Sequence, residues 1–145
     1  MLSAEQNKLL TETDPNTSCG DLLRRYWQPA ALTEELVGSR PAIAVRLMGE
    51  DLVLFKDERG RYGLVDRRCP HRGADLCYGR LEDGGLRCPF HGWSWHIDGR
   101  LKQIPADWDF PQTATRNLSL PEIRTDTWAG FVFINPDLEA EESTN

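Results

Sequence analysis

Two cysteine–histidine pairs lie in the middle of the chain, within residues 69–91. Cys69 and His71 form a C-x-H pair, and Cys88 and His91 form a C-x-x-H pair. Sixteen residues separate the two pairs, and each pair offers one thiolate and one imidazole. Side chains of these types at these spacings predict a metal centre held between two loops.

Prolines and glycines beside the four candidate ligands indicate that both loops are short. Pro70 and Gly73 lie in the first loop, and Pro89 and Gly92 lie in the second. Proline fixes φ next to a ligand, and glycine lets the backbone approach an ion closely. We therefore expect two tight loops whose tips face each other.

Three kinds of chemistry fit this set of residues. A Rieske 2Fe-2S cluster is held by two Cys on one iron and two His on the other, which matches the two mixed pairs. A structural zinc ion also takes Cys and His, but its usual spacings pair like ligands, as C-x₂₋₄-C and H-x₃₋₅-H. A disulfide between Cys69 and Cys88 would leave both histidines without a reason to recur at ligand spacing. The pattern favours the cluster and leaves zinc and the disulfide as alternatives.

The charges around the pairs favour electron uptake. With two thiolates and two neutral imidazoles, a 2Fe-2S cluster is neutral when oxidised, so it takes an electron more easily than a cluster with four thiolates. Five arginines lie within residues 67–87 against three acidic residues, and positive charge stabilises the reduced form. Arg72, next to His71, is expected at the cluster surface, whereas Arg80 and Arg87 equally fit a solvated basic face.

Composition limits the classes of protein that this chain can belong to. The 145 residues, 39% hydrophobic and 28% charged, suffice for one soluble domain. The net charge of −6 argues against a nucleic-acid partner. No apolar run approaches a membrane span, and the N-terminus lacks a signal peptide, so we expect a cytoplasmic protein. Cys19 and Cys77 are then expected to be free thiols.

The first half of the chain predicts short helices followed by strands. Ser3 is a plausible N-cap for a helix over 3–12, and a second short helix is expected over 20–26. Leu23, Tyr26 and Trp27 are expected in the core. Three segments with alternating or continuous apolar residues, separated by turn residues, predict an antiparallel meander that begins at Pro41. These segments are 43–48, 52–55 and 62–65.

The second half predicts further strands around the ligand loops. Asp98-Gly99 indicates a hairpin turn, and 102–117 is expected to be a loop with Trp108 and Phe110 anchored on the body. Strands over 123–127 and 131–135 are expected to complete the domain. The predicted fold is all-β, a small antiparallel barrel or sandwich with two cluster-binding loops and short N-terminal helices. The expected divisions are an N-terminal helical segment over 1–28, a 2Fe-2S domain over 29–136 and an acidic polar tail over 137–145.

Several stretches resemble a known family. CPHRGADL and YGRLEDGGLRCPFHGW resemble the Rieske domain of the alpha subunit of ring-hydroxylating Rieske non-haem iron oxygenases, with the phthalate-dioxygenase-like branch the closest. The segments MLSAEQNKLL, LLRRYWQPA and TWAGFVFINPD are similar to segments of the same proteins. The resemblance covers nearly the whole chain, to about Asp137.

The resemblance implies roles for individual residues. It implies that Cys69, His71, Cys88 and His91 hold the 2Fe-2S cluster, and that Trp93 packs beside the second loop. Respiratory-chain Rieske proteins carry a further Cys in each loop, and the two form a disulfide. The corresponding places here hold Ala74 and Phe90, as in the oxygenase-type domains, which have lower potentials.

The resemblance also implies a function and leaves an alternative. Complete alpha subunits continue into a catalytic domain with a 2-His-1-carboxylate iron. Outside the two pairs this chain has only His96, whose simplest role is that of a strand residue facing solvent. We therefore expect an electron-transfer module without a catalytic iron site, and we leave open whether the chain alone counts as an enzyme. The alternative is a free-standing Rieske-type ferredoxin, which would resemble only the β body and not the segment LLRRYWQPA.

The expected partners follow from the same reading. A reductase or ferredoxin would donate electrons, and an oxygenase catalytic domain or subunit would accept them. We expect an acidic partner to dock on a basic rim formed by Arg67, Arg68 and Arg72.

Overall fold

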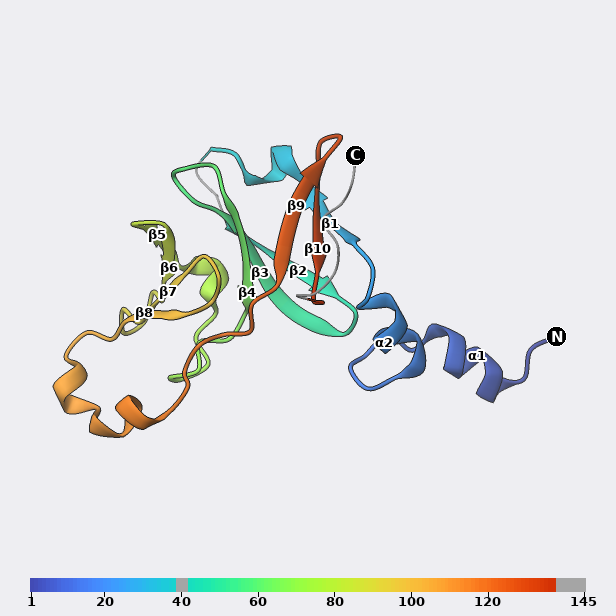
Figure 1. The fold of residues 1–145 in the computed structure, drawn as a ribbon, viewed down its shortest axis with the longest axis horizontal. Helices are drawn as coiled ribbons and strands as arrows, with labels where there is room; N and C mark the ends of the chain where they lie inside the picture. Colours follow the sequence, from blue (N-terminus) through green and yellow to red (C-terminus); the bar gives the residue numbers. More distant parts are fainter. Residues whose placement is uncertain (39–41, 138–145) are drawn as a thin grey trace.

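Three small antiparallel sheets form the body of the protein (Figure 1). The structure, a computed structural model, describes residues 1–38 and 42–137. Its helices are α1 (Ala4–Thr11), α2 (Ser18–Leu23) and the short 3₁₀ turns η1 (Thr33–Leu36), η2 (Leu76–Tyr78), η3 (Asp107–Asp109) and η4 (Pro111–Thr115). Its strands are β1 (Gln28–Leu32), β2 (Ala42–Leu47), β3 (Glu50–Lys56), β4 (Tyr62–Asp66), β5 (Arg80–Glu82), β6 (Gly85–Arg87), β7 (Ser94–His96), β8 (Leu101–Gln103), β9 (Arg124–Trp128) and β10 (Phe131–Asn135).

Strand β3 lies between two hydrophobic cores. Successive side chains of a strand point to opposite faces, and residues 52–55 are buried on both faces. Val53 and Phe55 pack with the cysteines and tryptophans of the ligand region. Leu52 and Leu54 pack on the other side against Val132 and Ile134 of β10. The predicted all-β antiparallel fold is thereby confirmed, and sheet β2-β3-β4 packs against sheet β1-β10-β9.

The third sheet, in the order β5-β6-β7-β8, carries the second ligand loop between β6 and β7. Leu86 and Trp95 are paired in register on β6 and β7, and both are fully buried. The indole N–H of Trp95 donates to the carbonyl of Leu118 at 3.2 Å, which satisfies its polar edge inside the core. Burial of such side chains contributes about 1.5–3 kcal/mol each, which fixes the sheet under the loop.

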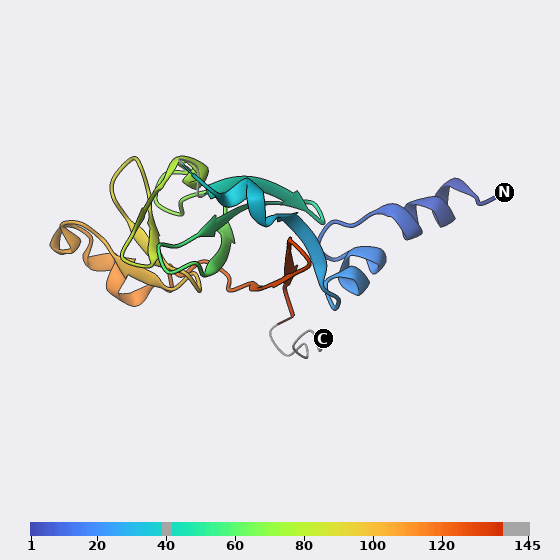
Figure 2. The ribbon, with the colours of Figure 1, turned by 90° about the horizontal axis from the view of Figure 1, so that it is seen from above.

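The N-terminal helices extend away from the sheets (Figure 2). Ser3 caps α1 as predicted, through a reciprocal bond with Gln6, but no residue of α1 is buried. Arg24, at the end of α2, donates to the carbonyl of Met48 at 2.7 Å and to the carboxylate of Glu50 at 2.8 Å. This residue ties α2 to the β2–β3 turn. The prediction that Tyr26 lies in the core is wrong, because its side chain is 61% exposed.

Other local predictions also need correction. Strands β1 and β5 were not expected, because QPAAL does not alternate and RLE is only three residues long; each forms by pairing with a neighbour, β10 and β6 respectively. Trp108 does not anchor its loop, since it is 77% exposed, whereas Phe110 does pack on the core. Pro41 and most of the predicted tail, residues 138–145, lie outside the described residues. No helix in the described part of the chain is long and apolar enough to cross a membrane.

Candidate metal centre

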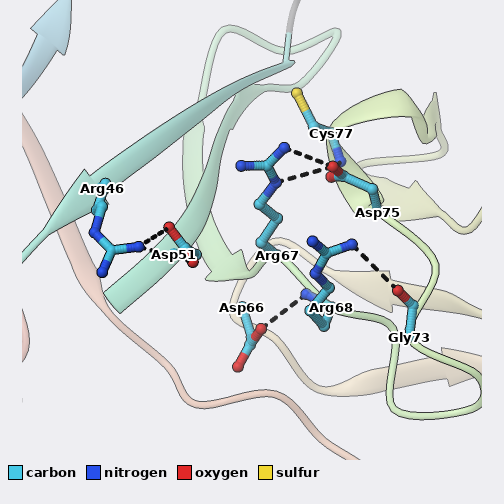
Figure 3. A network of polar contacts seen from close by, with 8 residues as sticks. All are labelled: Arg46, Asp51, Asp66, Arg67, Arg68, Gly73, Asp75 and Cys77. Carbon is cyan, nitrogen blue, oxygen red and sulfur yellow. Dashed lines mark hydrogen bonds and ion pairs between the residues drawn. The ribbon is translucent and has the colours of Figure 1, made fainter. Parts of the chain in front are cut away.

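The first ligand loop, residues 69–74, follows β4 and is closed by its own backbone. The N–H of Cys69 donates to the carbonyl of Ala74 at 2.9 Å, and the N–H of Gly73 donates to the carbonyl of Cys69 at 2.8 Å. Gly73 has a φ of +69°, which glycine adopts without a steric cost. At the base of the loop, Arg67 donates twice to one oxygen of Asp75, at 2.7 and 2.9 Å (Figure 3).

The second ligand loop, residues 88–93, repeats these bonds at equivalent positions. The N–H of Cys88 donates to the carbonyl of Trp93 at 2.7 Å, and the N–H of Gly92 donates to the carbonyl of Cys88 at 3.2 Å. Gly92 has a φ of +76°, like its counterpart in the first loop. The pattern R-C-P-x-x-G therefore folds twice in the same way, from residues 68–73 and 87–92. The histidine occupies the third loop position in the first case and the fourth in the second.

Gly79 sets how closely the bases of the two loops approach. A Cβ at this position would lie 2.8 Å from the carbonyl oxygen of Arg87 and 2.9 Å from that of Leu76. Both atoms belong to the backbone and could not move without shifting a strand or η2. A glycine is therefore required for the two loops to lie side by side.

The fold brings the four predicted ligands together between the loops. The rings of His71 and His91 have centroids 4.6 Å apart, and Cys69 and Cys88 are 2% and 3% exposed. Burial raises the pKa of the Cys69 thiol to about 11, and the adjacent Cys88 thiol adds to the rise. Without a metal, Cys69 is a neutral thiol at pH 7, so binding of a metal must displace its proton.

The environment of His71 fits a metal ligand. Among the residues that the structure describes, its Nδ1 is one of three buried side-chain polar atoms that have no hydrogen-bond partner. Burial, followed by the charges of His91 and Arg72, holds the pKa of His71 below its ordinary value, so the imidazole is neutral at pH 7. A neutral imidazole with a free, buried nitrogen is the form that binds iron. Two buried thiols and this nitrogen match the donor set of a 2Fe-2S cluster.

The alternatives considered from the sequence agree less well with this geometry. All four cysteines are free thiols, so Cys69 and Cys88 are not joined by a disulfide. Each loop offers one Cys and one His, and this mixed set suits a 2Fe-2S cluster better than the like pairs that are usual for zinc.

Aromatic side chains cover one side of the site and leave the other open. Trp93 stacks on His71, and Phe110 meets both rings edge-on at 5.6 and 5.9 Å. His91 is exposed, and its ring centroid lies 3.9 Å from that of the similarly exposed Phe90 and 4.6 Å from that of His71. His96 lies apart on β7, opposite Gly85. The site therefore faces solvent through His91.

The arginines near the site fall into two groups. Arg67 is engaged with Asp75, and Arg87 donates to Glu82 and to the backbone of the second loop. Arg68 and Arg72 are exposed, although Arg68 also reaches the carbonyl of Gly73 at 3.4 Å (Figure 3). The sequence did not reveal the role of Arg87; the repeated R-C-P-x-x-G pattern was the signal for it. Of the expected basic rim, Arg68 and Arg72 are free to meet a partner, whereas Arg67 has a structural contact.

The comparisons with known proteins agree with the fold and the site. The Rieske 2Fe-2S domain family matches residues 26–114, and the chain belongs to this family. A 2Fe-2S cluster is the group that the family holds, so the predicted cofactor is confirmed.

Individual relatives are oxygenase subunits. The chain is 52% identical over 107 residues to the 5,5'-dehydrodivanillate O-demethylase oxygenase subunit of Sphingobium sp., covering 72% of this chain and 24% of that protein. It is 38% identical over 136 residues to the phthalate 4,5-dioxygenase oxygenase subunit of Pseudomonas putida, covering 92% and 30%. The resemblance to the phthalate-dioxygenase-like branch is thereby confirmed. The chain spans about a quarter of the length of such relatives.

Solved structures show the same arrangement of strands. NdmA of Pseudomonas putida CBB5 superposes with a TM-score of 0.71 at 29% identity, over 81% of this chain and 36% of that one. Dicamba monooxygenase superposes with a TM-score of 0.67 at 28% identity, over 79% and 33%.

Proposed function

We propose that this chain is the electron-transfer module of an aromatic ring-hydroxylating oxygenase. Cys69 and Cys88 would hold one iron of the 2Fe-2S cluster, and His71 and His91 would hold the other. The observation that carries this proposal is the pairing of two buried thiols with a buried, partnerless imidazole nitrogen between two loops of equal backbone structure.

The side chains of the site suit one-electron exchange. The bound cluster supplies a centre that accepts and releases single electrons. Trp93 and Phe110 pack against His71. This packing excludes water from that side of the site and holds the imidazole in one orientation. The exposed His91 offers a route from the centre to a partner at the surface.

The partners that we propose follow from the relatives. These proteins are named as oxygenase subunits, so we propose a reductase or ferredoxin as the donor. The acceptor would be a mononuclear iron in an oxygenase catalytic domain or subunit. The cytoplasm remains the predicted location of this exchange.

A free-standing Rieske ferredoxin is the less favoured alternative. The match to the phthalate 4,5-dioxygenase subunit covers 92% of the chain, more than the β body alone. An oxygenase origin accounts for this extent, whereas a small ferredoxin accounts only for the sheets.

Metal analysis of the purified protein tests the proposal. We expect a brown protein with two irons and two acid-labile sulfides per chain, and a Rieske-type electron paramagnetic resonance spectrum after reduction. Reduction by dithionite and reoxidation should be reversible. A colourless protein with stoichiometric zinc would overturn the proposal.

A further inference from the structure

The side chain of Arg87 closes the second ligand loop from the outside. Arg87 directly precedes Cys88, and Gly92 directly follows His91, so these two residues frame both ligands of the loop. The Nη1 of Arg87 donates to the carbonyl of Gly92 at 2.8 Å. This bond joins the residue before the first ligand to the residue after the second.

Arg87 is itself held in place from two further strands. Its Nε donates to the carboxylate of Glu82 on β5 at 2.7 Å, and its Nη2 donates to the side-chain carbonyl of Gln103 on β8 at 3.3 Å. The side chain is 21% exposed. The donors of a guanidinium are fixed in one planar fork. The contacts with Glu82 and Gln103 therefore orient the whole group and aim the remaining N–H at the Gly92 carbonyl.

The backbone that Arg87 holds has little freedom to compensate. Gly92 adopts a φ of +76°, and its N–H already donates to the carbonyl of Cys88 at 3.2 Å. A Cβ on Gly92 would lie 3.1 Å from the Pro105 ring, so this residue is also crowded from outside. The peptide between Gly92 and Trp93, one residue beyond His91, is therefore oriented by the donor that its Gly92 carbonyl finds.

The first loop has a weaker version of the same bond. Arg68, at the equivalent position, reaches the carbonyl of Gly73 at only 3.4 Å and is exposed. That loop is held instead at its base by Arg67 and Asp75. Of the two loops, only the second, which carries the exposed His91, has a short and partly buried bond from arginine to glycine, that between Arg87 and Gly92.

We propose that Arg87 is a positioning residue for the iron-binding pair Cys88 and His91. It acts by fixing the Gly92 carbonyl, and with it the backbone that presents His91. Its positive charge makes a separate and smaller contribution to cluster binding. The proposal rests on the proposed function, since it requires these two residues to be ligands. It predicts that loss of the fork loosens cluster binding even where the charge is retained.

Three substitutions separate position from charge. Arg87→Ala removes the bond and the charge. Arg87→Lys keeps the charge, but one ammonium cannot reproduce the fork. Arg80→Ala is the matched control, because Arg80 faces Arg87 in the β5–β6 register and is exposed, so it removes an equal charge nearby. Each variant is loaded with the cluster, and its release to an iron chelator and its paramagnetic resonance spectrum are measured.

We expect Arg87→Ala to release the cluster about tenfold faster than the wild type, as is typical when a residue that orients a metal ligand is lost. Its g-values should shift, and Arg87→Lys should fall between the two proteins. Arg80→Ala should stay within about twofold of the wild-type rate with an unchanged spectrum.

Other outcomes would overturn the inference. Wild-type release from both folded variants at position 87, or equal acceleration in Arg80→Ala, would show that Arg87 does not position the ligands. If Arg87→Ala does not fold, the release rate of Arg87→Lys decides between the same two results. A wild-type protein that takes up no cluster would instead overturn the proposed function, and this inference with it.

Discussion

The indole of Trp93 lies flat on the imidazole of His71, with ring centroids 4.6 Å apart and planes within 2° of parallel. Trp93 belongs to the second loop and His71 to the first, so one stacked pair joins the two loops. Trp93 is only 4% exposed, and Phe110 meets both rings from the side. This contact is therefore a structural link and a part of the environment of the metal.

Replacing Trp93 by Ala should destabilise the protein and disturb the site. Loss of a buried aromatic side chain costs about 3–5 kcal/mol of unfolding free energy, which urea denaturation would measure. Trp108→Ala is the control, since that side chain is 77% exposed, and it should change stability by no more than about 0.5 kcal/mol. Equal losses in the two variants would contradict the role of the stack.

Replacing His71 or His91 by Cys should lower the reduction potential wherever a cluster still assembles. A thiolate adds negative charge where a neutral imidazole was bound, and the expected fall is about 100 mV or more. His96→Ala should leave the potential and the spectrum unchanged, because His96 lies on β7 outside the site. An unchanged potential in an assembled His→Cys variant would show that the replaced residue is not a ligand.

Asp57 should make the stability of the protein depend on pH. Its carboxylate is buried, which raises its pKa, but hydrogen bonds from Arg61 and the N–H of Arg59 outweigh this and hold the pKa below its ordinary value. A lowered folded-state pKa means that the stabilisation is present above the unfolded pKa, near 3.9, and is lost as the pH falls through the folded value.

The variant Asp57→Asn should therefore be less stable than the wild type by about 2 kcal/mol at pH 7. The difference should shrink as the pH falls below about 4, because the carboxylate of the unfolded wild type then binds a proton that the folded protein takes up only at a lower pH. Asp107→Asn, at an exposed position, serves as control. If the stability difference between the wild type and Asp57→Asn stayed constant from pH 7 to below about pH 4, the charge of Asp57 would not be its cause.

The exposed arginines beside the first loop should govern docking. Arg72→Glu should slow reduction by an acidic partner roughly tenfold at low salt, and the wild-type rate should fall with added salt. Arg25→Glu makes the same change in charge after α2, which lies on the far side of the body from β6 (Figure 1), and should have little effect. A rate that is independent of salt would rule out this basic docking surface.

Local sequence signals predicted most of the strands and the four residues of the site. Strands β2, β3 and β4 were predicted because their apolar residues alternate or run continuously between turn residues. The metal centre was predicted because Cys and His recur at ligand spacing with Pro and Gly beside them. Their roles as ligands remain a prediction that the metal analysis will test.

What the sequence did not predict depends on contacts between distant residues. Strand β1 exists because β10, about a hundred residues later, pairs with it across a bulge between Pro29 and Ala31. Tyr26 and Trp108 are large and apolar, yet no surface of the described body covers them. Arg87 fitted a solvated face equally well, since only Gly92 among its acceptors belongs to the repeated R-C-P-x-x-G pattern. The other two, Glu82 and Gln103, lie on strands that no spacing rule connects with it.

The backbone bonds that close each loop mean that the protein itself bears the entropic cost of forming the site. Ordering a residue costs about 1–2 kcal/mol, and bonds such as that from Gly73 to Cys69 are made within the polypeptide alone. Because these bonds do not use the cluster as a partner, we expect the loops to be ordered before it enters, unlike a zinc finger, which folds only around its ion. Cluster insertion should then follow folding, and stripped protein should retain slow amide exchange at Gly73 and Gly92.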